Sequence, residues 1–294
     1  MNVEEGRHLW AMVYLLHAYF GRDGREEAEE LLARHSGDAD KPRILTTFNE
    51  PISDWLSFYC FTYFTDRDGK YQLKSFAESA FDPLSRTCRF MLTEEAHHMF
   101  VGETGIGRVV KRTLEVMKDL GSDDPARIRA QGAVDLPTLQ KYLNFWCSSS
   151  LDLFGSEISS NSAANFASGL KGRPDEPQYE DHVLREKTMK LLTPEGEQDV
   201  PVLNALNEVM RESYLKDCEI GLKRWNRQIE RAGFPFRLSL PSTRFRRSIG
   251  AWAGQPVTPQ GEIIGRETFE KSLCDWIPSD SDKVFVHSDR KSVV

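Results

Sequence analysis

The sequence has little cysteine, and no two cysteines stand at the spacing of a metal site. Its five cysteines are odd in number, lie far apart and form no C-x-x-C pair. Neither a disulfide framework nor a thiolate metal site is indicated. We therefore expect a protein of a reducing compartment, the cytoplasm.

Long apolar runs and an excess of positive charge are also missing. The longest apolar run, residues 9–20, is interrupted by His17 and is shorter than the roughly 20 residues that a membrane-spanning helix needs. The formal net charge of −7 argues against nucleic acid as the main partner. We expect neither a membrane nor a nucleic-acid partner.

Helical periodicity is present over most of the 294 residues. Apolar residues recur at helical spacing, which predicts helices over residues 3–20, 25–35, 53–66, 83–102, 136–154, 179–192 and 202–232. From Gly233 the pattern changes to short segments broken by prolines such as Pro235 and Pro256. We expect an all-α helical domain over residues 1–232 and an irregular C-terminal extension over residues 233–294 that wraps the domain.

The last six residues, 289–294, form an abrupt polar end. They match a reading-frame translation of a common sequencing adapter. We hypothesise that they are an assembly artefact, and source DNA that codes them in genuine continuity would refute this.

One pattern occurs twice, at residues 4–8 (EEGRH) and 94–98 (EEAHH), and both copies read acidic, Glu, any residue, basic, His. A Glu and a His three residues apart on a helix project from nearly the same face. Carboxylate-bridged di-iron bundles use two Glu-x-x-His helices and one carboxylate from each of two further helices. Two such helices packed together would provide most of a dinuclear metal site.

The second copy alone leaves the register open, because it contains two overlapping Glu-x-x-His pairs. The first copy resolves it, since Glu4 has Arg7 and not His three residues later. The predicted ligand pairs are therefore Glu5 with His8 and Glu95 with His98. Their neighbours, Glu4 and Glu94, are each able to accept the free N–H of a ligating His on the facing helix.

A single Glu-x-x-His pair is more often a solvated acid beside a surface His, with no metal bound. Two copies flanked by apolar residues favour a metal site, because burying that many ionisable groups is costly unless they are paired or bind metal. Mixed carboxylate and imidazole ligands without thiolate favour iron over zinc.

Two further features leave alternatives open, and a third suggests a phosphate loop that we reject. Asp66 shares a helix face with Tyr59 and Thr62, but Asp-Arg-Asp-Gly is equally typical of a turn that ends a helix. The segment 159–173 carries Lys171 and Arg173; a surface loop is the default interpretation, and a loop for an anionic ligand is the alternative. Residues 102–107 contain three glycines but follow a predicted helix and lack a Gly-Lys-Ser/Thr ending, so we reject a phosphate loop.

Residues 3–10, 92–105 and 168–173 carry a resemblance that extends over nearly the whole chain. The sequence resembles the oxygenase components of benzoyl-CoA epoxidase, di-iron enzymes of aerobic benzoate degradation through CoA thioesters. The resemblance implies a ferritin-like helical bundle in which the metal ligands are Glu5, His8, Asp66, Glu95 and His98. Asp66 is included in this set of ligands because related CoA-ester epoxidases place an acid in that helix.

The resemblance also implies a reaction and its partners. Two iron ions and O2 would convert benzoyl-CoA to 2,3-epoxybenzoyl-CoA, with NADPH electrons arriving through a separate flavin or iron–sulfur reductase. Lys171 and Arg173 are candidate contacts to CoA phosphates by charge complementarity.

The chain departs from the family pattern at its start. Ferritin-like di-iron sites need one more carboxylate from a preceding helix, and only four residues precede Glu5. We expect a fragment without its first bundle helix and sixth ligand. The alternatives are another ferritin-like di-iron protein, such as a desaturase, a radical-generating subunit or an iron-storage protein, and a non-catalytic helical fragment.

Overall fold

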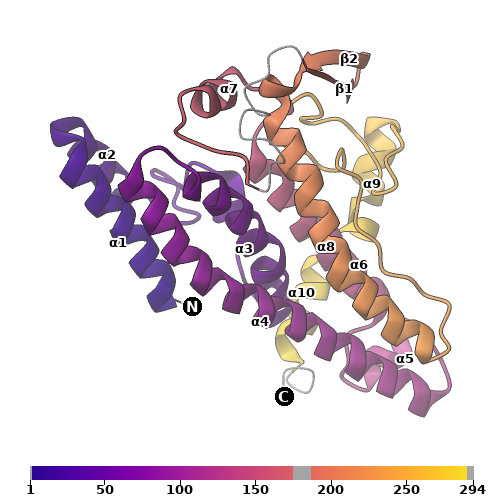
Figure 1. Ribbon diagram of the computed structural model, residues 1–294. Coiled ribbons are helices and arrows are strands. Elements are labelled where there is room, and N and C mark those ends of the chain that lie inside the picture. The colour runs from indigo at the N-terminus through magenta and orange to yellow at the C-terminus, as the bar shows by residue number, and fades with distance from the viewer. Residues whose placement is uncertain (1, 175–186, 290–294) are drawn as a thin grey trace.

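The computed structural model describes residues 2–174 and 187–289, and these form a mostly helical bundle (Figure 1). This confirms the predicted all-α, ferritin-like class. The principal helices are α1 (Asn2–Tyr19), α2 (Gly21–Ala33), α3 (Trp55–Ala77), α4 (Asp82–Leu120), α5 (Pro125–Ala130), α6 (Leu136–Leu151), α7 (Ser160–Ala167), α8 (Leu206–Arg231), α9 (Arg266–Trp276) and α10 (Asp280–Ser288).

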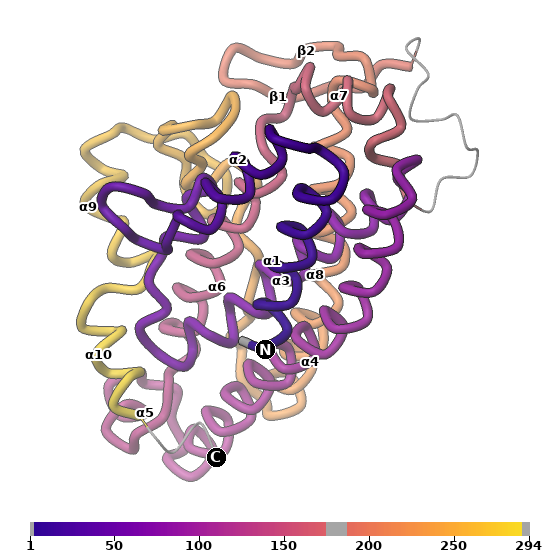
Figure 2. The backbone as a smooth tube through the Cα atoms, turned by 90° about the vertical axis from the view of Figure 1, so that its left-hand side faces the viewer, coloured from indigo at the N-terminus to yellow at the C-terminus, as the bar shows by residue number. Residues whose placement is uncertain are grey.

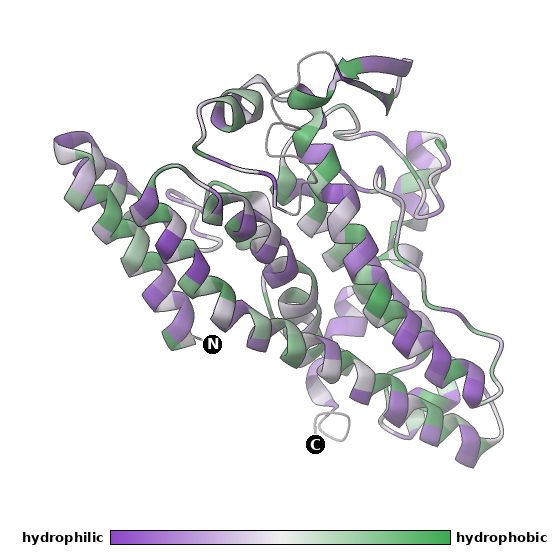
Figure 3. Cartoon of the chain, viewed as in Figure 1, coloured by the Kyte–Doolittle hydropathy of each residue, from purple (hydrophilic) through white to green (hydrophobic). Residues whose placement is uncertain are grey.

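The main hydrophobic core lies where α3, α4, α6 and α8 meet. Its largest fully buried side chains include Tyr63, Trp146 and Trp225, each from a different helix. Figure 3 shows hydrophobic and hydrophilic residues alternating along α4 and α8, as expected for helices that bury one face. The long helix α4 also packs against α1, which places the two Glu-x-x-His copies on neighbouring helices.

Helix α3 runs further than the sequence predicts. The expected end at Asp66 is wrong, because α3 continues to Ala77. Arg67 and Asp68 are buried inside the bundle, and Arg67 Nη1 donates a hydrogen bond to the carbonyl of Tyr63 at 3.0 Å. Burial of these side chains outweighs the local turn preference of Asp-Arg-Asp-Gly.

Helix α4 likewise continues past its predicted end at Gly102. It ends at Gly121, which has a left-handed φ of 57° and donates its N–H to the carbonyls of Met117 and Lys118. The earlier glycines serve helix packing: a Cβ on Gly102 would lie 2.5 Å from the backbone nitrogen of Tyr63, and one on Gly105 would collide with the ring of Tyr59. The absent side chains let α4 approach α3 closely, one turn beyond the second motif.

The region predicted as a helix over residues 179–192 is different where it is described. Residues 179–186 lie outside the described residues, and Thr188–Thr193 forms strand β1, so that part of the prediction is wrong. Strand β1 pairs antiparallel with β2 (Gly196–Pro201), from Thr188 opposite Pro201 to Thr193 opposite Gly196. The segment 159–173, predicted as a loop, contains α7, whose N-cap Ser159 accepts from the backbone N–H of Ser162.

The C-terminal extension is irregular from residue 233 to residue 265 and then forms α9 and α10 (Figure 2). Asp282 in α10 accepts hydrogen bonds from Arg129 at 2.8 Å and Lys141 at 3.2 Å, and so joins α10 to α5 and α6. The extension therefore contains more helix than its proline-rich sequence suggests.

Within residues 2–174 and 187–289, no helix has both the length and the apolar character needed to cross a bilayer.

Candidate metal centre

Three helices bring acidic and imidazole side chains to one place. Glu5 and His8 lie one turn apart on α1, and Glu95 and His98 lie one turn apart on α4. Asp66 extends from α3 toward the same cluster. His98 is fully buried, and the side chain of Glu95 is 7% exposed.

Three carboxylates converge on one ring nitrogen of His98. Its Nδ1 lies 3.1 Å from Glu5 Oε1, 3.6 Å from Glu95 Oε2 and 3.8 Å from Asp66 Oδ2. Glu5, Glu95 and His98 each offer one ligand atom within 4.8 Å of the other two, so these three residues can share a single cation, and Asp66 lies beside them.

The other oxygens of the same two glutamates face His8. His8 Nδ1 lies 3.6 Å from Glu5 Oε2 and 3.5 Å from Glu95 Oε1. Glu5 and Glu95 therefore each direct one oxygen toward His98 and the other toward His8. The two glutamates are thus shared between the two imidazole rings.

Hydrogen bonds on the far side of each ring orient the two imidazoles. His8 Nε2 lies 2.9 Å from Glu94 Oε2, and His98 Nε2 lies 3.1 Å from Glu4 Oε2. Each bond crosses between α1 and α4. A carboxylate at Nε2 favours a proton there, which leaves the Nδ1 lone pair directed into the cluster.

Arg7 also belongs to the site, although the motif spacing predicts no role for its side chain there. Its guanidinium forms an ion pair with Glu94, the carboxylate that also contacts His8. The available signal was the basic position that precedes His in both copies of the motif. In the second copy this position is His97, which is exposed.

The residues present fit a bound cation. Asp66 Oδ2, Glu95 Oε2 and His98 Nδ1 are buried and have no hydrogen-bond partner within the described chain. Burial and the charges of Glu95 and Glu5 hold the pKa of Asp66 well above its usual range. Burial, together with nearby carboxylates beginning with Glu5, raises the pKa of Glu95 to about 8. A divalent ion would satisfy these atoms and relieve the repulsion between the acids.

The two halves of the cluster are unequal. Asp66 adds a third carboxylate on the His98 side. On the His8 side, only Glu5 and Glu95 approach Nδ1 among the described residues. Nδ1 of His98 therefore has three carboxylate groups nearby, and Nδ1 of His8 has two.

The segment that carries Lys171 and Arg173 follows α7 and packs against α3, away from the acidic cluster. Lys171 Nζ donates to Gln72 Oε1 at 3.3 Å and lies 4.7 Å from the centre of the Phe76 ring. Burial lowers the pKa of Lys171. Since Gln72 follows Asp66 by six residues, this contact lies about 9 Å further along the helix axis. The segment is held there by backbone hydrogen bonds, and Arg173 is its second cation.

Comparison with known proteins identifies a relative. The chain is 57% identical over 293 residues, 98% of its length, to benzoyl-CoA oxygenase component B of Aromatoleum evansii. The chain spans 62% of the length of that protein. No protein-family model matches the sequence.

Proposed function

We propose that this chain, which belongs to the same family as benzoyl-CoA oxygenase component B, forms the metal-binding helices of a di-iron oxygenase. The observation that carries the proposal is the position of Glu5 and Glu95, each of which presents one oxygen to His98 Nδ1 and one to His8 Nδ1. Mixed carboxylate and imidazole donors suit iron.

In this proposal, Glu5, Glu95 and Asp66 would hold the ions together with His8 and His98. Bound iron would supply the reduction of O2 and the transfer of one oxygen atom to substrate. The chain contributes ligation and orientation: Glu94 and Glu4 hold the Nε2 protons of the two rings, so that both Nδ1 atoms remain free to bind. Glu95 and His98 are buried, which limits the access of water to their side of the site, whereas the side chain of Glu5 is 51% exposed.

The substrate class is proposed from the family. The relative's name contains benzoyl-CoA and describes one component of an oxygenase. We infer a CoA thioester of an aromatic acid as substrate and 2,3-epoxybenzoyl-CoA as product. We also infer a separate reductase component, with flavin or iron–sulfur groups, that delivers electrons from NADPH. Lys171 and Arg173 remain candidate contacts to CoA phosphates, although the ammonium of Lys171 already contacts Gln72 and Phe76.

Product analysis tests this function. The iron-loaded protein is incubated with benzoyl-CoA, O2, NADPH and a reductase component, and CoA thioester products are separated and weighed by mass spectrometry. The proposal expects a product heavier by one oxygen atom that carries 18O from 18O2. A protein that retains iron but leaves benzoyl-CoA unchanged would favour another class of di-iron protein, such as a desaturase.

A further inference from the structure

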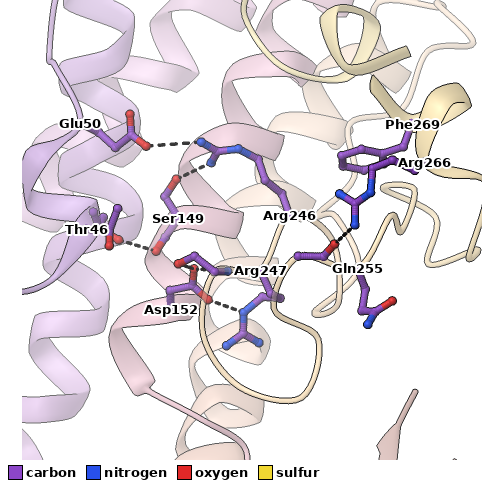
Figure 4. Close-up of a pocket in the computed structure, with 12 residues that line it drawn as sticks. Thr46, Glu50, Ser149, Asp152, Arg246, Arg247, Gln255, Arg266 and Phe269 are labelled. Carbon is purple, nitrogen blue, oxygen red and sulfur yellow. Dashed lines mark hydrogen bonds and ion pairs between the residues drawn. The ribbon is translucent and has the colours of Figure 1, made fainter. Parts of the chain in front are cut away.

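A cavity with several charged residues in its lining lies apart from the metal cluster, between the loop before α3, the end of α6 and the C-terminal extension (Figure 4). Its volume is about 260 Å³. Binding sites for drug-sized molecules are typically about 300–1,000 Å³, so this cavity suits part of a large ligand. The residues that line it include Thr46, Glu50, Ser149, Arg246 and Arg266.

The lining of this cavity carries more positive than negative charge. Three guanidinium groups, of Arg246, Arg247 and Arg266, stand against two carboxylates, of Glu50 and Asp152. Arg247 is buried and engaged by Asp152 and Glu157. It therefore serves mainly to hold the extension against α6.

Arg266 is the least engaged of the three arginines in the lining. It is exposed at the first position of α9, and its hydrogen-bond acceptor is the carbonyl oxygen of Gly254. Among residues 2–174 and 187–289, Arg266 forms an ion pair with no carboxylate. The N-cap of α9 is Gly265, so no side chain caps the first turn of the helix, and its positive end adds to the attraction for an anion.

Arg246 lies across the cavity from Arg266 (Figure 4). Its guanidinium donates to Ser149 Oγ at 2.9 Å and to Glu50 Oε1 at 3.3 Å. Arg246 has a φ of 51°, in the left-handed region that non-glycine residues rarely occupy. Such backbone strain persists where the surroundings fix it, and it often accompanies binding sites. Both arginines line the cavity, but Arg247 is buried against Asp152 and Glu157, whereas Arg246 is half-buried and its guanidinium meets Ser149 and Glu50.

The cavity is linked to the metal cluster through one pair of helices. Ser149 lines the cavity, and the next residue, Ser150, shares a 3.1 Å hydrogen bond between hydroxyl groups with Thr65. Thr65 immediately precedes Asp66 in α3. The cavity thus lies beside the same level of the α3–α6 pair as Asp66.

We propose that this cavity binds a phosphate group of a nucleotide between Arg246 and Arg266, and that this nucleotide is the adenosine 3′,5′-bisphosphate end of the CoA thioester. The second part rests on the proposed function. Arginine binds phosphate through paired, charge-assisted hydrogen bonds. The hydroxyl of Thr46 adds a neutral donor at the rim.

The test measures binding of adenosine 3′,5′-bisphosphate by calorimetry. The chain is compared with Arg266→Ala and with Arg244→Ala, a matched control from the same extension that contacts Trp252 outside this cavity. Lys171→Ala tests the competing location. Loss of one charged hydrogen-bond partner should weaken binding by about tenfold or more, and we expect this for Arg266→Ala alone.

Three outcomes would overturn the proposal: equal binding by Arg266→Ala and Arg244→Ala, loss of binding in Lys171→Ala instead, or no binding by the unaltered chain. Inorganic phosphate that competes as well as the bisphosphate would overturn the assignment to CoA. Because the readout is nucleotide binding, it is independent of iron. Nucleotide binding in a chain that takes up no iron would contradict the proposed function and leave the phosphate site standing.

Discussion

Glu94 Oε2 on α4 lies 2.9 Å from His8 Nε2 on α1, while Glu4 on α1 makes the reciprocal contact to His98 on α4. Each motif therefore supplies two ligand candidates and also the carboxylate that orients the imidazole of the other motif. The two helices depend on one another for the geometry of the site.

This reciprocity predicts the effect of Glu94→Ala. Without the carboxylate, His8 loses the partner that fixes its protonation at Nε2, and we expect iron affinity to fall about 10–100-fold. The measurement is a competition titration with a chelator under anaerobic conditions. Glu115→Ala, which removes an acid from the exposed side of the same helix, is the control. Equal affinity in both variants would show that Glu94 does not orient a ligand.

The close approach of α4 to α3 predicts opposite effects for two glycines of α4. A Cβ on Gly102 would meet the backbone of Tyr63 at 2.5 Å, whereas one on Gly107 would lie 3.6 Å from Trp225 Nε1 at ordinary contact distance. We expect Gly102→Ala to lower the free energy of unfolding by about 1–3 kcal/mol. Gly107→Ala should be neutral or stabilising by up to about 1 kcal/mol through helix propensity. Chemical denaturation measures both, and destabilisation by the two changes alike would argue against the packing explanation.

These glycines also show what sequence could and could not predict. A glycine within a helical pattern is typical of a helix end, and only the neighbouring helix reveals that Gly102 serves close packing. The same holds for Asp66-Arg67-Asp68-Gly69, a typical turn sequence whose middle residues are buried within α3. In both places the end of the helix depends on which side chains are buried by other helices, and local sequence preferences carry no information about that burial.

The positions in the candidate site were more accessible to sequence reasoning. Glu5, His8, Glu95 and His98 follow a repeated spacing, and spacing on a helix directly determines which side chains share a face. Asp66 has no second predicted ligand at helical spacing on α3, so only the packing of α3 determines whether it approaches the cluster. The cavity around Arg246 and Arg266 joins segments far apart in sequence, and no local pattern indicates it.

Asp282, which attaches α10 to α5 and α6, predicts that the free energy of unfolding depends on pH. Burial opposes ionisation of Asp282, but hydrogen bonds from Ser279, Arg129 and Lys141 outweigh it and lower the pKa of Asp282 to about 2. Because the folded pKa lies below the unfolded value, the contribution is complete above about pH 4 and is lost as the pH falls toward 2. The ionised Asp282 side chain therefore contributes about 2 kcal/mol to the free energy of unfolding.

The free energy of unfolding of Asp282→Ala should therefore lie below that of the unaltered chain at pH 6, and the difference should shrink as the pH falls toward 2. Asp280→Ala is the control, since Asp280 is fully exposed on the same helix. A difference that stays constant from pH 6 to pH 2 would be inconsistent with this account.

Iron content after anaerobic Fe(II) loading and removal of loosely bound metal tests the central claim most directly. The unaltered chain is compared with Glu95→Ala, His98→Ala, His8→Ala and the control His97→Ala, whose side chain is exposed beside the site. We predict that the unaltered chain and His97→Ala retain equal iron and that Glu95→Ala loses most of it. His98→Ala should lose more than His8→Ala, because the donors are more complete around His98. No retained iron in the unaltered chain, or equal iron in all five proteins, would contradict a metal centre at this cluster.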